Sequence, residues 1–377
     1  MRPWYAALEK RPEMATSNGS NGDTPRIDGS DDKNRHAFID RVKVLVAHRH
    51  IEPICVYQNL GVEEKTGEIA RASYSFSKVP GPYDCACVKT AYTTDFSHLV
   101  MDFCPGKYLS GNNLFGPQDL SKTVTTVVPD ILRRLNLRLS AEEEELLFAG
   151  TSRLYRVDST ALQSIGTDEA VNAYLDGLAT GRHQTLKRRT TEPGSVTFGK
   201  PDYYKVVIYN KHQELVKKAG IWGEIYGQTA RQLLLDEAVG MVRTEVQMRS
   251  KKLLYEGLST VADWTPLTPG NIVRKNQRLI KVNECHSLPP QMLSELKKQT
   301  QAVYRMWLDG IDPKTHYSRG GLRPHREALL AVGIDITVRH TGKKLPQQES
   351  LSCSQILEMP YEPPSEKLIE SGLYVQL

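Results

Sequence analysis

The stretch Val206-Val207-Ile208-Tyr209-Asn210-Lys211-His212-Gln213-Glu214 decides how this chain is interpreted. Its β-branched beginning predicts a buried or half-buried strand. Because successive side chains of a strand alternate between its faces, Tyr209 and Lys211 are expected on the same side. A cation beside a phenol favours the phenolate and attracts phosphate, which makes Tyr209 a candidate nucleophile. The alternative is a tyrosine that ends an ordinary strand.

Length and composition indicate a globular protein. The chain has 377 residues, of which 39% are hydrophobic and 25% charged, enough for a large core and two domains. We expect no membrane association and a cytoplasmic location, because the chain contains neither an apolar run of membrane-spanning length nor a signal peptide. The net charge of +5 permits a nucleic-acid partner without requiring one. The six cysteines form no Cys-x-x-Cys pair, which argues against a zinc ribbon.

Composition shifts divide the chain into three parts. Residues 1–36 are rich in Gly, Ser, Asn and Asp and predict a disordered tail, within which Met14 is an alternative start. Residues 37–262 are expected to form the main domain and residues 263–377 a smaller, mainly helical domain. In the latter, helices at 291–308 and 319–332 flank a turn, and the second carries Arg319, Arg323 and Arg326. This pattern fits a helix-turn-helix DNA reader, and the alternative is a packing domain with surface arginines.

Three predicted strands each place functional groups on one face. They carry Arg156 with Asp158, Tyr209 with Lys211, and Arg243 with Glu245. If these strands are neighbours in one sheet, the groups suit metal-assisted attack on a phosphodiester. Asp158 and Glu245 would hold Mg²⁺ or Mn²⁺ through hard oxygen ligands, while Lys211 and an arginine offset developing charge. The alternative is an antiparallel sheet whose polar side faces water.

Two other segments are candidates for contact with DNA. One is the basic loop of Lys187, Arg188 and Arg189, which precedes the strands leading to Tyr209 and would otherwise be a solvated face. The other is the compact loop that contains Asn112 and Asn113. The sequence His48-Arg49-His50 is interpreted as a solvated strand end or a basic loop rather than a metal-binding pair, because an arginine separates the histidines.

Four segments, in this order, resemble the replication initiation proteins of filamentous bacteriophages, the gene II / phage X family. They are Leu-Ser-Gly-Asn-Asn-Leu-Phe-Gly-Pro-Gln-Asp-Leu at 109–120, Arg-Val-Asp-Ser-Thr at 156–160, Val-Ile-Tyr-Asn-Lys-His-Gln-Glu-Leu at 207–215 and Val-Arg-Thr-Glu-Val at 242–246. The resemblance covers residues 38 to 336. It departs from the family at Asn112, where a histidine is usual, and the chain lacks the His-hydrophobic-His pair typical of related nickases.

The resemblance implies an α+β fold with a central antiparallel sheet and flanking helices, plus the helical C-terminal domain. It implies a rolling-circle initiator whose domain 37–262 nicks one strand at the origin, keeps a 5′-phosphotyrosine and later joins strands. Tyr209 would be the nucleophile, Asp158 and Glu245 the ligands of Mg²⁺ or Mn²⁺, and Lys211, Arg156 and Arg243 charge stabilisers.

The implied partners are circular double-stranded phage DNA at the origin and the host replication helicase and polymerase, in the cytoplasm of a bacterial host. Whether the protein binds DNA as a homodimer is left open by the sequence. Two alternatives also stay open, a plasmid rolling-circle initiator and a non-catalytic DNA-binding replication regulator. A Tyr209→Phe variant separates the enzyme from the regulator, since only the enzyme loses cleavage.

Overall fold

The computed structural model describes residues 31–62, 69–91, 97–186, 188–200, 202–222, 227–281, 290–332, 334, 336–337 and 352–377. The chain divides into two units, Met1–Asp32 and Lys33–Leu377, and the second contains the fold. Most of the predicted tail, residues 1–30, lies outside the described part. Asn34, however, is buried and its side chain bonds those of Asn271 and Arg274. Folded structure therefore begins before residue 37.

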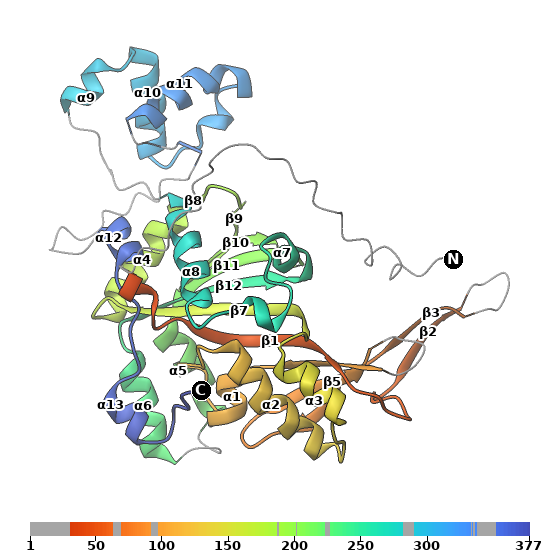
Figure 1. The fold of residues 1–377 in the computed structure, drawn as a ribbon. Coiled ribbons are helices and arrows are strands. Elements are labelled where there is room, and N and C mark those ends of the chain that lie inside the picture. The colour runs from red at the N-terminus through yellow and green to blue at the C-terminus, as the bar shows by residue number, and fades with distance from the viewer. Residues whose placement is uncertain are drawn as a thin grey trace, which may run out of the picture. The chain divides into compact units, whose positions relative to one another are not determined.

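A nine-stranded sheet forms the centre of this unit, in the order β4-β5-β6-β1-β7-β12-β11-β10-β9 (Figure 1). Every neighbouring pair is antiparallel. The strands in chain order are β1 (Phe38–Ala47), β4 (Ser77–Pro80), β5 (Cys85–Thr90), β6 (His98–Phe103), β7 (Arg153–Ser164), β9 (Arg188–Glu192), β10 (Ser195–Lys200), β11 (Tyr204–Asn210) and β12 (Met241–Arg249). The predicted α+β fold with a central antiparallel sheet is confirmed, and the three candidate strands β7, β12 and β11 are direct neighbours.

Smaller elements complete the sheet structure. A hairpin pairs β2 (Gln58–Val62) with β3 (Ile69–Tyr74), and a short ladder pairs β8 (Arg182–His183) with β13 (Ile280–Lys281). Short helices α1 (Pro105–Ser110) and α7 (Ser250–Tyr255) follow β6 and β12 directly. Within the described part of the chain, no helix combines the length and apolar character needed to span a membrane.

One face of the sheet is covered by the main hydrophobic core. The helices that supply buried residues to it include α2 (Leu120–Arg134), α3 (Ala141–Phe148), α4 (Asp168–Thr180) and α8 (Thr268–Arg278). Strand alternation explains which side chains face them: in β11, Tyr204, Val206 and Ile208 are buried there, while Tyr209 points to the other face. Each fully buried aliphatic side chain contributes roughly 1.5–3 kcal/mol, so this face fixes the register of the strands.

The opposite face is covered only in part. A smaller core joins Phe38, Leu114, Leu215 and Leu368, with contributions from α5 (Lys211–Trp222), α6 (Gln228–Ala238) and α13 (Glu366–Glu370). Elsewhere this face carries charged and polar side chains, and we call it the polar face. Its members on the central strands include Arg41, Lys43, Asp102, Arg156, Asp158, Tyr209, Glu245 and Gln247.

The C-terminal region contributes to more than one core. Helices α9 (Pro290–Glu295), α10 (Lys298–Leu308) and α11 (Arg319–Ala331) share their own cluster around Tyr304, Trp307 and Leu329. The prediction of one continuous helix at 291–308 is wrong, because α9 ends before α10 begins, whereas α11 forms as predicted. Helices α8 and α12 (Cys353–Glu358) instead supply residues to the main core. The domain boundaries at 36 and 262 remain predictions.

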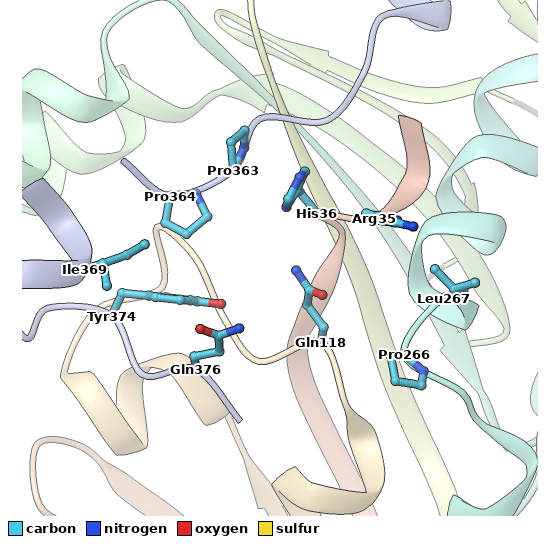
Figure 2. Close-up of a pocket in the computed structure, with 10 residues that line it drawn as sticks. All are labelled: Arg35, His36, Gln118, Pro266, Leu267, Pro363, Pro364, Ile369, Tyr374 and Gln376. Carbon is cyan, nitrogen blue, oxygen red and sulfur yellow. The ribbon is translucent and has the colours of Figure 1, made fainter. Parts of the chain in front are cut away.

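A buried arginine fastens the end of the chain to the sheet domain. Arg274 of α8 donates hydrogen bonds to the backbone carbonyls of Leu357 and Met359 and lies over the ring of Tyr361, 4.4 Å from its centroid. Farther along, Pro363, Pro364 and Tyr374 line a cavity of about 360 Å³ opposite His36 and Gln118 (Figure 2). The last residues thus return to the beginning of β1.

Candidate active site

A pocket of about 460 Å³ opens on the polar face. Its wall combines residues of β1, β7, β11 and β12 with the turn between β9 and β10 and the first turns of α5. The residues that line it include Asp40, Arg41, Lys107, Asn113, Arg156, Asp158, Tyr209, Glu214, Lys217, Glu245 and Gln247. The predicted nucleophile and both predicted metal ligands therefore line one pocket.

Tyr209 is bound to one of these carboxylates. It lies opposite Arg243 in the β11–β12 ladder, and its Oη donates a hydrogen bond of 2.6 Å to Oε1 of Glu245. Burial raises the pKa of Tyr209 well above its ordinary value, against the lowering effect of the Arg243 charge. The phenol is consequently protonated at neutral pH. The expectation that a neighbouring cation favours phenolate is wrong for this arrangement, where burial outweighs the cation.

Asp158 is held by its neighbour on the same face of β7. Arg156 bonds both carboxylate oxygens, with Nε 2.7 Å from Oδ1 and Nη2 2.5 Å from Oδ2. Burial raises the pKa of Asp158 to about 7; the Arg156 contact opposes this rise, and the charges of Glu245 and Asp40 add to it. The raised pKa of Asp158 is therefore mainly an effect of its burial, to which the neighbouring carboxylates add.

Arg243 is an internal counter-ion. Its side chain is fully buried, with Nη2 2.6 Å from Oδ1 of Asp40 and Nε 3.0 Å from Oε1 of Glu245. It also donates to the Asn113 carbonyl and lies over the Phe38 ring. Arg243 is not among the residues that line the pocket. Its geometry suits holding two carboxylates in place rather than the predicted direct contact with substrate.

Lys211 reaches the site by a different route from the one predicted. β11 ends at Asn210 and Lys211 begins α5, so the expected continuation of strand alternation is wrong. Its buried Nζ bonds Oδ1 of Asn113 at 3.1 Å and Oε2 of Glu214 at 2.8 Å. Burial, with the charge of Arg243, lowers the pKa of Lys211 to about 8. Lys211 thus braces the loop that carries Asn113.

Asp40 is a site residue that the sequence interpretation missed. The pairing of β1 with β7 is irregular between Ile39 and Arg41, as at a β-bulge, and Asp40 is the residue left out of the register. Although burial raises it, the charges of Arg243 and Lys211 bring the pKa of Asp40 below its ordinary value. The alternation expected over β1 gives no sign of this irregular pairing, and the one local signal is an acidic residue that directly follows the apolar pair Phe38 and Ile39.

The two loop asparagines face inward. Asn112 is buried and its amide donates to the Leu373 carbonyl at 2.7 Å, so the predicted contact of Asn112 with DNA does not fit this arrangement. Asn113 lines the pocket and connects Lys211 with Asp40, to which its amide donates at 3.1 Å. The loop that resembles the phage family therefore holds two charged groups of the site in place.

The remaining candidates that the structure describes are not among the residues that line the pocket. Lys187 lies outside the described residues, and Arg188 and Arg189 belong to the edge strand β9. Arg319 and Arg323 are exposed on α11, where Arg323 pairs with Glu327 at 2.8 Å, and Arg326 is half-buried. His48 and His50 follow β1 with ring centroids 5.7 Å apart, and because His48 is buried, the prediction of a solvated strand end is wrong for that residue. The contribution of the basic residues to DNA binding remains a prediction.

Two carboxylates of the pocket, those of Asp158 and Glu245, are the candidates for binding Mg²⁺. Among the described residues, no group of three His, Cys, Asp or Glu side chains is arranged to hold a metal ion. Mg²⁺ commonly binds through one or two carboxylates together with waters and substrate phosphates. Asp158 and Glu245 both line the pocket, although Arg156 bonds both oxygens of Asp158, and a closed cage made by the protein alone is not present in this part of the chain.

Comparison with known proteins identifies a family for the part of the chain that contains this pocket. The model of the Phage_CRI family, described as the N-terminal part of a phage replication-associated protein, matches residues 39–266, more than half of the chain. The chain belongs to this family. A similar protein is a replication-associated protein of Enterobacteria phage I2-2, with 25% identity over 308 residues that cover 80% of this chain and 88% of the relative. The family assignment confirms the resemblance to filamentous phage initiators, and this chain is a phage replication initiator of that type.

All the pocket residues, from Asp40 to Gln247, fall inside the region that the family model matches. Helices α9, α10 and α11 lie beyond it. No solved structure matches this chain.

Proposed function

We propose that this protein nicks one strand of phage DNA at the replication origin through Tyr209 and later joins the strand again. The observation that supports it most is the position of the Tyr209 hydroxyl in the pocket, 2.6 Å from Glu245 and beside Asp158 and Asp40. A nick in circular DNA leaves a 3′ hydroxyl, which can serve directly as a primer end for replication.

In this proposal the phenolic oxygen of Tyr209 attacks the phosphorus of the scissile phosphodiester. Its proton moves to Oε1 of Glu245, which already accepts the hydrogen bond. The bond between phosphorus and the 3′ oxygen breaks, the 3′ oxygen takes a proton from water and leaves as a hydroxyl, and Glu245 releases the proton of Tyr209 to water. The 5′ phosphate stays on Tyr209 as an ester. The released 3′ hydroxyl, attacking that ester later, joins the strand without ATP.

The cofactor of this reaction is proposed to be Mg²⁺ or Mn²⁺, which Asp158 and Glu245 would hold. The bound ion would polarise the scissile phosphate. Arg156 then orients Asp158, and Arg243 orients Glu245 and Asp40. Lys107 and Lys217, which line the pocket, are the cations best placed to meet the phosphates of the strand.

Recognition of the origin is assigned in this proposal to α11. Its Arg319 and Arg323 are exposed, and a helix that follows a helix and a turn can enter the major groove. The implied partners are the circular duplex and, once the 3′ end is free, the host helicase and polymerase. Binding as a homodimer would place two α11 helices on the DNA.

Incubation of the protein with supercoiled origin DNA and Mg²⁺ tests the proposal. We expect a protein–DNA adduct that resists denaturant, and its loss in Tyr209→Phe with origin binding retained. A Tyr209→Phe protein that still nicks would refute Tyr209 as the nucleophile. If neither protein forms nicks or adducts but both bind the origin, the chain is a non-catalytic regulator.

A further inference from the structure

A second feature of the polar face lies away from the pocket, around Phe76. This residue connects β3 to β4, and its ring is half-buried. The Nζ atoms of Lys43 and Lys89 lie 4.7 Å and 4.9 Å from the ring centroid. Lys43 belongs to β1 and Lys89 to β5, the strands on either side of β6. One aromatic ring thus holds two ammonium groups together above β6.

The two lysines have no carboxylate partner among the described ion pairs. Asp102, the acid nearest to them in the ladder, is occupied by Arg41, with Nε 2.7 Å from Oδ1 and Nη2 3.2 Å from Oδ2. Lys89 donates instead to the backbone carbonyl of Tyr74 at 3.1 Å. Burial lowers the pKa values of both Lys43 and Lys89, which reflects their partial removal from water. The charge of Asp102 still acts on Lys43, but neither lysine forms an ion pair within the described part of the chain, and two partly desolvated cations so placed are complementary to an anionic ligand.

The position of this cluster relates it to the proposed cleavage site. β6 and β11 are separated by three strands, β1, β7 and β12, so the ring and Tyr209 are on the order of 19 Å apart across the sheet. Arg41 and Arg156 lie between them on the same face and line the pocket. A strand that crosses the polar face from Phe76 to the pocket therefore meets guanidinium groups along its path.

We propose that Phe76, Lys43 and Lys89 form a base-stacking site for an unpaired segment of the DNA strand that Tyr209 cuts. A base stacks on the Phe76 ring, and the lysines move from the ring to the adjoining phosphates. Aromatic rings accept any base, and lysines follow the backbone, so this site selects for single-stranded character rather than sequence. This inference depends on the proposed function in one respect only, namely that the bound DNA is the strand that Tyr209 cuts.

The test uses the full chain with Tyr209→Phe, so that binding is measured without cleavage. The probe is a single-stranded oligodeoxythymidylate that carries one 2-aminopurine, whose fluorescence falls when it stacks. We expect the Tyr209→Phe protein to quench the fluorescence. The same protein with Phe76→Leu as a second substitution should not quench it and should bind the oligonucleotide about tenfold more weakly. Phe76→Trp should keep both signals. Lys43→Gln and Lys89→Gln should each reduce the slope of log affinity against log salt by about one.

Phe148→Leu is the matched control, because Phe148 is exposed on α3, a helix of the main-core side, and should change nothing. Thermal unfolding checks that each variant is folded. If folded Phe76→Leu protein binds and quenches like its parent, the stacking site is refuted, whatever the nicking assay shows. If nicking fails while the Phe76-dependent quenching persists, only the catalytic proposal is lost.

Discussion

The hydroxyl of Tyr209 on β11 donates a 2.6 Å hydrogen bond to Glu245 on the adjacent strand β12. Two features follow from this contact. The phenol, whose pKa burial raises, has an anion in place to receive its proton, and the same anion is held by Arg243 with its Nε 3.0 Å away. The nucleophile and its acceptor are thus positioned before any substrate binds.

Glu245→Gln should reduce nicking strongly. Glutamine preserves the size of the side chain, yet it is a poor proton acceptor, and general-base contributions are about 10²–10⁴-fold. We expect a rate loss within that range in single-turnover nicking of supercoiled DNA, with DNA affinity nearly unchanged. Gln247→Ala is the matched substitution on the same face of β12, and it should cost far less. Nicking at the original rate by Glu245→Gln would contradict the role of Glu245.

Arg243→Met should destabilise the fold. Removing this cation leaves Asp40 and Glu245 close together without compensation, and breaking a buried ion pair from one side costs about 3–5 kcal/mol. Equilibrium denaturation measures the change. Arg323→Met is the matched control, because both side chains of its pair with Glu327 are exposed, 79% and 63%, and such a pair contributes little to stability. Equal losses in the two variants would be incompatible with Arg243 as the internal counter-ion.

Much of the site could be predicted because strand alternation is a local property. The period of two predicts that Asp158, Tyr209 and Glu245 each lie on the polar face of their own strand. In the structure all three line the pocket. The order of the strands does not follow from periodicity, and the resemblance to phage initiators supplied the reason to bring them together. The pairing of β7 with β12 and of β12 with β11 then makes the three strands neighbours.

The parts that were missed depend on non-local geometry. Asp40 enters the site through an irregular pairing of β1 with β7, which leaves no mark on the periodic pattern. Lys211 was assigned to a strand because an element boundary is set by the surrounding packing, and here the helix begins one residue after the strand ends. Contacts such as that of Asn112 with Leu373 join residues far apart in the sequence and have no local signal.

The free energy of unfolding should increase with pH between about 8 and 10.5, the range set by the folded and ordinary pKa values of Lys211. Its pKa is about 8 in the folded protein against an ordinary value of 10.5, so the unfolded chain binds the proton more tightly. As pH rises from about 8 to 10.5, the unfolded state loses this advantage and the free energy of unfolding gains a positive contribution. Denaturation of the parent protein and of Lys211→Met over this range should show a steeper rise in the parent. Parallel curves would exclude a depressed pKa at Lys211.

Arg274→Met should release the C-terminal segment. The substitution leaves the carbonyls of Leu357 and Met359 without their donor and removes the cation from the Tyr361 ring. Since Leu373 accepts the amide of Asn112, the loosened segment should also free the loop that supports Lys211 and Asp40. We expect faster amide hydrogen exchange in residues 352–377 and then in residues 112–115.

Lys275→Met is the control for this release. The Lys275 side chain follows Arg274 on α8, is 62% exposed and pairs with Glu256 at 2.8 Å, so exchange in both segments should stay unchanged. Faster exchange in residues 352–377 with full protection of residues 112–115 would show that the loop holds its position without the C-terminal segment. Unchanged exchange in residues 352–377 of Arg274→Met would instead show that the apolar contacts of α12 with the main core hold the segment without the arginine.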